Sequence, residues 1–131
     1  MPTEDVKRLF PRSHRLKSSL LIRDVMRQRH ALFCFPIKCF YTVQPASAEP
    51  VKTAFMVSKK RFHHAVDRNR VKRLMREAYR LNRQEFALPK GTSANICWMF
   101  VGTELPSYTQ VETAVRTILK ELQSYIQSER S

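Results

Sequence analysis

The residues of this sequence that could do chemistry are cations, and they gather in one stretch of the chain. Ten lysines and arginines lie between Lys59 and Arg83, and only Asp67 and Glu77 oppose them. Arginine presents a planar fork of donors that suits the oxygens of a phosphate group. This density therefore predicts a surface that binds a phosphate-bearing polymer, rather than a site that breaks bonds by itself.

A helix predicted over residues 66–86 would carry these cations. Its apolar residues recur at the spacing of a buried helix face: Val71, Leu74, Met75 and Ala78. Four cations on the opposite face repeat every four residues in a stripe about 18 Å long: Arg68, Lys72, Arg76 and Arg80. Like charges at this spacing weaken an isolated helix by about 0.2–0.5 kcal/mol per pair, so stability alone would favour interleaved acids. We therefore interpret the stripe, with Arg73 and Arg83 beside it, as a binding surface.

Few residues suit protein catalysis or metal binding. His63 and His64 are adjacent and have no partner histidine at a defined distance, which disfavours a protein ribonuclease that would also use Lys60. The chain has two glycines, too few for a glycine loop around a nucleotide phosphate. Its three cysteines lack the CxxC spacing of a zinc site, so we expect buried free thiols in a reducing cytoplasm.

The other elements follow from apolar periodicity and from the positions of proline and glycine. A first helix is expected after Ser18 or Ser19, either of which can cap it. Its buried face is Leu21, Ile22, Val25 and Met26. Strands are expected over residues 37–43, 52–58 and 94–101, and residues 31–35 are an additional candidate. A loop over residues 44–50 should join the first two strands in antiparallel pairing.

A last helix is expected from Ser107, because Ser107 and Gln110 have the S-x-x-Q form of a capping box. Its apolar stripe is interpreted as core rather than as a partner surface: Val111, Ala114, Val115, Ile118, Leu122, Tyr125 and Ile126. This order predicts an α+β fold, a compact two-layer α/β sandwich in the order α-β-β-β-α-β-α. We expect a flexible basic arm over residues 1–14, a single domain over residues 15–127 and a tail over residues 128–131.

The chain as a whole combines a core with a strongly basic surface, since 43% of its residues are hydrophobic and its formal net charge is +13. Such a charge favours nucleic acid as the partner and says little about the fold. A helix-turn-helix DNA motif needs a helix before the recognition helix. Here a predicted strand precedes the basic helix, which disfavours duplex DNA. An acidic membrane surface is the weaker partner class for such a charge. No apolar run approaches the ~20 residues of a membrane span, and no membrane partner is expected.

Two stretches carry a resemblance to a known family. Val57-Ser58-Lys59-Lys60 is followed by the run Arg68-Asn69-Arg70-Val71-Lys72-Arg73-Leu74-Met75-Arg76-Glu77. Together they resemble the signature of the bacterial ribonuclease P protein subunit, and the wider similarity runs from about Phe10 to Ile126. The resemblance implies a ribosomal-protein-like fold in which the basic helix belongs to a left-handed β-α-β crossover, a rare arrangement.

The resemblance also implies a function. Members of this family form a ribonucleoprotein with a catalytic RNA, and the complex removes the 5′ leader from precursor tRNA to give the mature 5′ end. The RNA carries the chemistry and binds most of the Mg²⁺, while the protein aids leader binding and metal affinity. The endoribonuclease activity then belongs to the complex, and the isolated chain should be inactive. The expected partners are the catalytic RNA and precursor tRNA in the cytoplasm, not DNA.

Two binding surfaces follow from the resemblance. The residues expected to contact the catalytic RNA are Arg68, Asn69, Arg70, Lys72, Arg73, Arg76, Lys60 and Arg61. A cleft between the first helix and the sheet should hold the leader, with Ile22, Met26, Phe33, Tyr41 and Lys59 as its residues. Aromatic rings can stack on unpaired bases of any sequence, for ~1–3 kcal/mol each.

This sequence departs from the family pattern near both surfaces. Family members often carry aromatic residues where Ile22 and Met26 stand, so the expected leader stacking is either weaker or shifted to Phe33, Phe35 or Phe40. The turn over residues 61–64 is one residue longer than in the family and lacks its common glycine. A structural RNA-binding protein of ribosomal type, with similar charge and fold but no leader cleft, stays open as the alternative.

Overall fold

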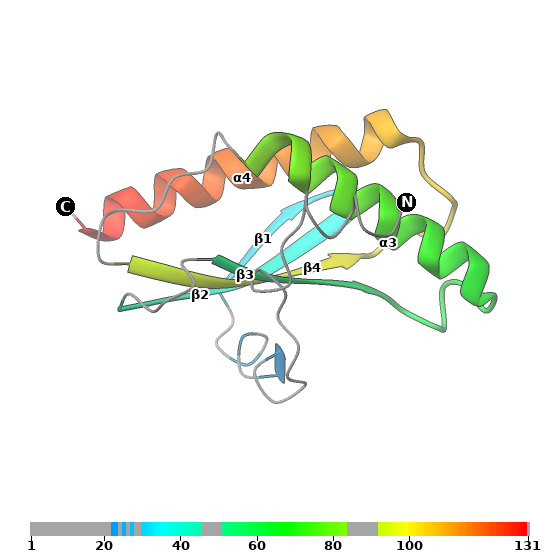
Figure 1. Ribbon diagram of the computed structural model, residues 1–131, viewed down its shortest axis with the longest axis horizontal. Coiled ribbons are helices and arrows are strands. Elements are labelled where there is room, and N and C mark those ends of the chain that lie inside the picture. Colours follow the sequence, from blue (N-terminus) through cyan, green and yellow to red (C-terminus); the bar gives the residue numbers. More distant parts are fainter. Residues whose placement is uncertain are drawn as a thin grey trace, which may run out of the picture.

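The computed structural model describes residues 22, 23, 25, 27, 30–45, 51–83 and 92–130 of the chain. They form an α+β fold of two layers, a four-stranded sheet with two long helices across one face (Figure 1). The strands are β1 (Ala31–Cys34), β2 (Ile37–Pro45), β3 (Val51–Val57) and β4 (Thr92–Phe100). The helices are α3 (Ala65–Asn82) and α4 (Tyr108–Arg130). The expected fold class is therefore confirmed.

The sheet has the strand order β1-β2-β4-β3. β1 pairs with β2, and β2 with β4, in antiparallel fashion, whereas β3 pairs with β4 in parallel. The expected pairing of residues 52–58 with residues 37–43 is wrong, because β4 lies between these strands. Every residue of β4 except Met99 is buried, as suits a strand with partners on both edges and cover on both faces. The left-handed sense of the β3-α3-β4 crossover stays a prediction.

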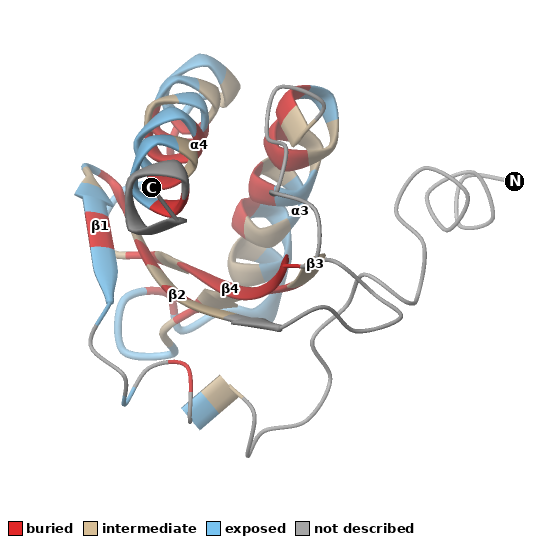
Figure 2. Ribbon diagram, turned by 90° about the vertical axis from the view of Figure 1, so that its left-hand side faces the viewer, coloured by how far each residue is buried: buried red, intermediate tan, exposed pale blue. Residues whose placement is uncertain are grey.

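The main hydrophobic core lies between the sheet and the two helices, whose buried residues face inward (Figure 2). The strands contribute Leu32, Ile37, Cys39, Tyr41, Val57, Ala94, Ile96, Trp98 and Phe100. The helices contribute Val71, Met75, Ala78, Tyr79, Val111, Ala114, Val115, Ile118, Leu119, Leu122 and Ile126. The expected place of Tyr125 in this core is wrong, since its side chain is 52% exposed. It lies about 100° around the helix from its neighbour Ile126, at the rim of the buried stripe.

A second, smaller cluster covers the opposite face of the sheet. Val25 packs there against Ala54 and Cys97, and Ile22 lies at the edge of the cluster. Ile22 and Val25 are helical, so these two positions of the expected first helix are confirmed, while Leu21 and Met26 lie outside the described residues. In Figure 1 the helical residues, in dark blue, lie on the side of the sheet away from α3 and α4. We call this side the second face.

Several element boundaries differ from the expected ones. α3 ends at Asn82 rather than at residue 86. Gln44 and Pro45 continue β2, where a loop was expected, because both still pair with β4. The candidate strand near residues 31–35 is confirmed as β1. The expected arm and the rest of the expected loop lie outside the described residues: 1–14 and 46–50.

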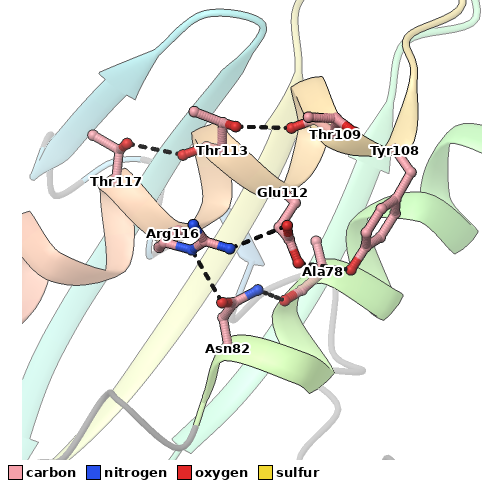
Figure 3. A network of polar contacts seen from close by, with 8 residues as sticks. All are labelled: Ala78, Asn82, Tyr108, Thr109, Glu112, Thr113, Arg116 and Thr117. Carbon is pink, nitrogen blue, oxygen red and sulfur yellow. Dashed lines mark hydrogen bonds and ion pairs between the residues drawn. The ribbon is translucent and has the colours of Figure 1, made fainter.

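Polar contacts join the end of α3 to the start of α4 (Figure 3). The Asn82 Nδ2 donates to the Ala78 carbonyl at 2.8 Å, and its Oδ1 accepts from the Arg116 Nε at 3.4 Å. Arg116 also forms an ion pair with Glu112 at 3.1 Å. The Tyr108 hydroxyl donates to Glu112 at 3.2 Å, and burial together with this bond raises the pKa of Tyr108. The Asn82–Arg116 hydrogen bond joins the two helices, the other contacts hold its two partners in place, and the shared core between the helices fixes the outward side of α3.

Candidate nucleic-acid interface

The outward side of α3 presents cations to solvent. Arg70, Arg73 and Arg76 are exposed at intervals of three residues, and Asn69 is exposed beside them. Their opposite side is the buried stripe that packs on the sheet and α4, as Figure 2 shows. Within the described residues, neither Arg70 nor Arg73 forms an ion pair. These two guanidinium groups are therefore available to phosphate oxygens.

The four-residue stripe does not form one exposed face, which corrects the expectation. The Arg68 Nη1 donates to the carbonyls of Phe62 and His63 at 2.8 and 2.9 Å, so Arg68 closes the turn before α3. Arg80 forms an ion pair with Glu77 on the same helix, and their hydrogen bond raises the pKa of Arg80. Four residues advance a helix by about 400°, so an i, i+4 stripe rotates by about 40° at every step. Such a stripe cannot stay on one side of the helix.

Lys72 and Arg76 lie nearer the flank of α3 than Arg70 and Arg73 do. Lys72 is half-buried. The Arg76 guanidinium lies 5.9 Å from the centre of the Phe55 ring, on β3 at the edge of the sheet. A cation over an aromatic ring keeps its charge and holds a preferred direction. Arg76 thus extends the basic surface from α3 towards the β3 edge.

A basic turn, residues 58–64, joins β3 to α3. The N–H groups of Arg61 and Phe62 both donate to the Ser58 carbonyl at 3.2 Å, and the Lys60 N–H donates to the Ser58 Oγ at 3.1 Å. The side chains of Lys59, Lys60 and Arg61 are exposed. The turn therefore adds three cations at the N-terminal end of α3, where the helix dipole already favours anions.

The second face combines an exposed aromatic ring with basic side chains. Phe33 points to this face because Leu32 and Cys34 point into the main core, and it is 57% exposed. Lys38 lies opposite Phe33 across the β1–β2 pair, and its Nζ lies 5.2 Å from the centre of the Phe40 ring. Exposed rings beside cations are the usual components of a surface that binds single-stranded nucleic acid.

Three cations of the second face are absent from the expected set. Arg23 and Arg27 are exposed and helical, four residues apart. Lys38 could have been found from the alternation along β2, since it shares its face with Phe40 and not with the buried Ile37.

One expected leader-binding residue lies on the wrong side of the sheet. Tyr41 is 6% exposed and belongs to the main core, so its expected place in the cleft is wrong. It lies an even number of residues from Ile37, which points towards the helices, and a period of two gives both residues the same face. Ile22 packs on the second face as expected, and Lys59 lies in the basic turn. Met26 lies outside the described residues.

A protein-family model described as Ribonuclease P matches residues 10–123 of the chain. The chain belongs to the ribonuclease P family. Among its relatives, the ribonuclease P protein component of Porphyromonas gingivalis is 36% identical over 112 residues, which cover 82% of each chain. That of Chlorobaculum tepidum is 42% identical over 78 residues, 60% of this chain and 43% of the relative.

Solved structures of ribonuclease P proteins share the fold. The Staphylococcus aureus protein gives a TM-score of 0.64 at 17% identity, over 83% of this chain and 94% of that one. The Thermotoga maritima protein gives a TM-score of 0.62 at 20% identity, over 82% and 96% of the two chains. At these identities the similarity concerns the fold, and it agrees with the family assignment.

The expected ribonuclease P protein component, a subunit of the ribonuclease P holoenzyme that processes tRNA, is therefore confirmed. The alternative of a structural RNA-binding protein without a processing role is not supported. Within the described part of the chain, no helix has the length and apolarity needed to cross a membrane.

Proposed function

We propose that this ribonuclease P protein component binds the catalytic RNA with α3 and the basic turn, and binds the 5′ leader of precursor tRNA with the second face. The observation that carries the proposal is the placement of these two basic surfaces on opposite sides of one sheet. A rigid sheet between them lets the protein hold both RNAs at once. The protein then brings the leader to a fixed place relative to the catalytic RNA.

We assign the surface for the catalytic RNA to side chains that project outward from α3 and from the basic turn. These are Asn69, Arg70, Lys72, Arg73, Arg76, Lys60 and Arg61. Arg68 supports them from within, because it holds the carbonyls of the turn that presents Lys60 and Arg61. Contacts of this kind go to the RNA backbone, so they position the protein and do not read sequence.

The surface for the leader is assigned to Phe33, with Lys38 beside it and Ile22 at the edge of the cluster. An exposed ring stacks on any base, and the neighbouring ammonium group neutralises the phosphate of the same strand. Such contacts tolerate any leader sequence, which suits a protein that serves many precursor tRNAs. Arg23 and Arg27 extend the positive charge of this face.

Mg²⁺ is assigned mainly to the RNA in this proposal. Within the described residues, no group of three or more His, Cys, Asp or Glu side chains could hold a metal ion. In this proposal the protein aids metal affinity by neutralising phosphates with its arginines and lysines, which lowers the repulsion that the metal ions must otherwise screen.

A cytoplasmic location is part of the proposal. Cys34, Cys39 and Cys97 are all free, and the last two are buried. Burial raises the pKa of the Cys39 thiol, and Cys97 adds to this effect. Protonated buried thiols are typical of proteins in a reducing compartment.

A cleavage assay tests the proposed function. The purified chain is added to bacterial ribonuclease P RNA and precursor tRNA at low Mg²⁺, and the rate of 5′-leader removal is measured. We expect faster cleavage than with the RNA alone, because the protein supplies positive charge and leader contacts. A rate equal to that of the RNA alone contradicts the proposal.

The second face has its own test within the same complex. Phe33→Ala should lower the affinity for precursor tRNA by about fivefold or more, the loss expected when one stacked base is released. The affinity for mature tRNA, which has no leader, should stay the same. Tyr125→Ala is the matched control, because Tyr125 is similarly exposed but lies on α4. Equal losses for precursor and mature tRNA would remove Phe33 from the leader surface.

A further inference from the structure

A small pocket lies at the end of the sheet where β2 begins and β4 ends. Its volume is about 150 Å³, and it lies between the turn from β1 to β2 and the loop from β4 to α4. The residues that matter for its chemistry are Phe35, Pro36, Phe100, Leu105, Glu104 and Gln110. The lining thus combines apolar surface with a few polar groups, as small-molecule sites usually do.

The backbone around the pocket is held closely together. The Val101 N–H donates to the Pro36 carbonyl at 2.8 Å and ties the loop to the turn. A Cβ at Gly102 would lie 2.8 Å from the Phe100 ring and 3.2 Å from Pro36, so any side chain there would force these groups apart. The pocket therefore depends on a close approach of two segments that lie far apart in the sequence.

The pocket is adjacent to the basic turn. The ring of Phe62, in that turn, lies 5.8 Å from the ring of Phe100, which lines the pocket. Lys60 and Arg61 directly precede Phe62 and are exposed. The basic turn and the pocket thus lie at the same end of the sheet, where the parallel strands β3 and β4 both end, so an RNA bound to these cations runs past the end of the sheet that holds the pocket.

The chemistry of the lining selects one part of a nucleotide. At about 150 Å³ the pocket is smaller than the ~300–1,000 Å³ of sites for drug-sized ligands, so it suits one ring system. The Glu104 carboxylate repels a phosphate but accepts hydrogen bonds from the amino group of a base. Phe35, 61% exposed beside it, offers a ring on which a base can stack.

We propose that this pocket binds one unpaired, amino-bearing nucleobase of an RNA whose phosphates contact the basic turn. Phe35 stacks on the base, and Glu104 accepts a hydrogen bond from its amino group. Gln110 adds an amide that can donate or accept at the base edge. The proposal rests on the RNA contact assigned above to α3 and the basic turn. The surface assigned above contacts only the phosphates of the RNA, and the pocket adds one position that recognises a base.

Photocrosslinking identifies the base and its source. The photoreactive residue p-benzoylphenylalanine replaces Phe35 in the full chain, which is then assembled with ribonuclease P RNA, with and without precursor tRNA. After irradiation, stops in reverse transcription map the crosslinked nucleotides. We expect crosslinks at one or a few unpaired nucleotides, either of the catalytic RNA or of the precursor, and the two arms show which. Crosslinks confined to paired regions, or none in both arms, overturn the proposal.

Affinity measurements on the assembled complex supply the second test. Phe35→Ala should weaken RNA binding about fivefold or more, whereas Tyr125→Ala should not. Glu104→Met removes a negative charge from a basic protein, so electrostatics alone predicts tighter binding. A bound base predicts weaker binding instead. Glu121→Met is the matched control, because it removes the same charge from an exposed position on α4.

The Arg73→Ala variant distinguishes a failure of the base pocket from a failure of the α3 surface. If it weakens RNA binding while Phe35→Ala binds as tightly as the native chain and Glu104→Met binds as tightly or more tightly, the base pocket is overturned and the α3 surface stands. If Arg73→Ala also has no effect, the α3 surface fails and the base pocket fails with it. Weaker binding in all three variants supports the pocket, provided that Tyr125→Ala binds like the native chain and Glu121→Met binds as tightly or more tightly.

Discussion

The arginines of α3 divide between two tasks at the scale of single residues. Arg68 donates to two backbone carbonyls of the basic turn, so part of its hydrogen-bonding capacity is used inside the protein. Arg73 is exposed and, among the described residues, forms no ion pair. A substitution of Arg68 would therefore disturb both the turn and the charge. Arg73 is the better probe of RNA contact, since its loss changes the charge alone.

The buried thiol of Cys97 predicts a dependence of stability on pH. An unfolded cysteine titrates near pH ~8.5, whereas burial raises the pKa of Cys97 to about 11 in the folded chain. The contribution of this thiol to stability is therefore fully present below the pKa of the unfolded chain. It is lost as the pH rises towards the pKa of the folded chain. For this thiol the slope is at most about 1.4 kcal/mol for each pH unit.

Denaturant unfolding of the native chain and Cys97→Ala between about pH 7 and pH 10 measures this effect. The variant lacks the thiol, so the native chain should lose more stability than the variant at alkaline pH. The difference between the two free energies of unfolding should therefore shrink as the pH rises. A constant difference across this range contradicts the prediction.

At the scale of elements, the loop from β4 to α4 depends on Gly102. A methyl group at this position would lie 2.8 Å from the Phe100 ring, and Phe100 is 1% exposed in the main core. Gly102→Ala should therefore lower the free energy of unfolding by about 1–3 kcal/mol, the usual cost of overpacking. Thermal or denaturant unfolding measures the loss. Thr103→Ala is the control, because Thr103 is exposed and should change stability by less than about 0.5 kcal/mol. A Gly102→Ala variant as stable as this control would contradict the close approach.

The elements themselves were largely predictable from local patterns. The spacing of Val71, Met75 and Ala78 predicts α3, and all three are buried. Ser107 was expected to cap α4, and its Oγ accepts the Gln110 N–H at 3.2 Å. The pairing of the strands was not predictable in this way. The residue patterns of β2 and β3 are typical of strands whether or not β4 lies between them, so they do not indicate which strands are neighbours.

At the scale of the whole molecule, a net charge of +13 is divided between surfaces with different expected partners. A protein that neutralises phosphates releases counterions, so its RNA affinity falls as the salt concentration rises. When the logarithm of the affinity is plotted against the logarithm of the salt concentration, each phosphate contact adds ~0.7–0.9 to the steepness of the slope. Arg73→Ala should flatten this slope for the catalytic RNA by about one contact. Lys120→Ala should not, although it removes one exposed cation from the other helix.

Affinities of both variants at several salt concentrations measure the two slopes. The comparison separates a contact from a general effect of charge, since both variants reduce the net charge equally. If both slopes flatten alike, RNA binding follows the total charge and α3 has no special part. If neither flattens, Arg73 does not reach the backbone of the RNA.

Local chemistry was enough to place this chain in its family and to locate its basic helix. The run from Arg68 to Glu77 and the preceding Val57–Lys60 carry the signature, and apolar periodicity locates the helix. Patterns of this kind depend on neighbours in the chain, because helix and strand periods are properties of the backbone itself. The cations, the core positions and the expected partners therefore follow without coordinates.

Contacts between distant segments settled the remaining questions. Packing determines on which side of the sheet Tyr41 lies, and the pairing of the strands places β4 between β2 and β3. The pocket beside Phe35 exists because the loop after β4 meets the turn before β2. Such features depend on which surfaces fold against each other, since burial and hydrogen bonding between remote residues are set by the whole chain and not by any one segment of it.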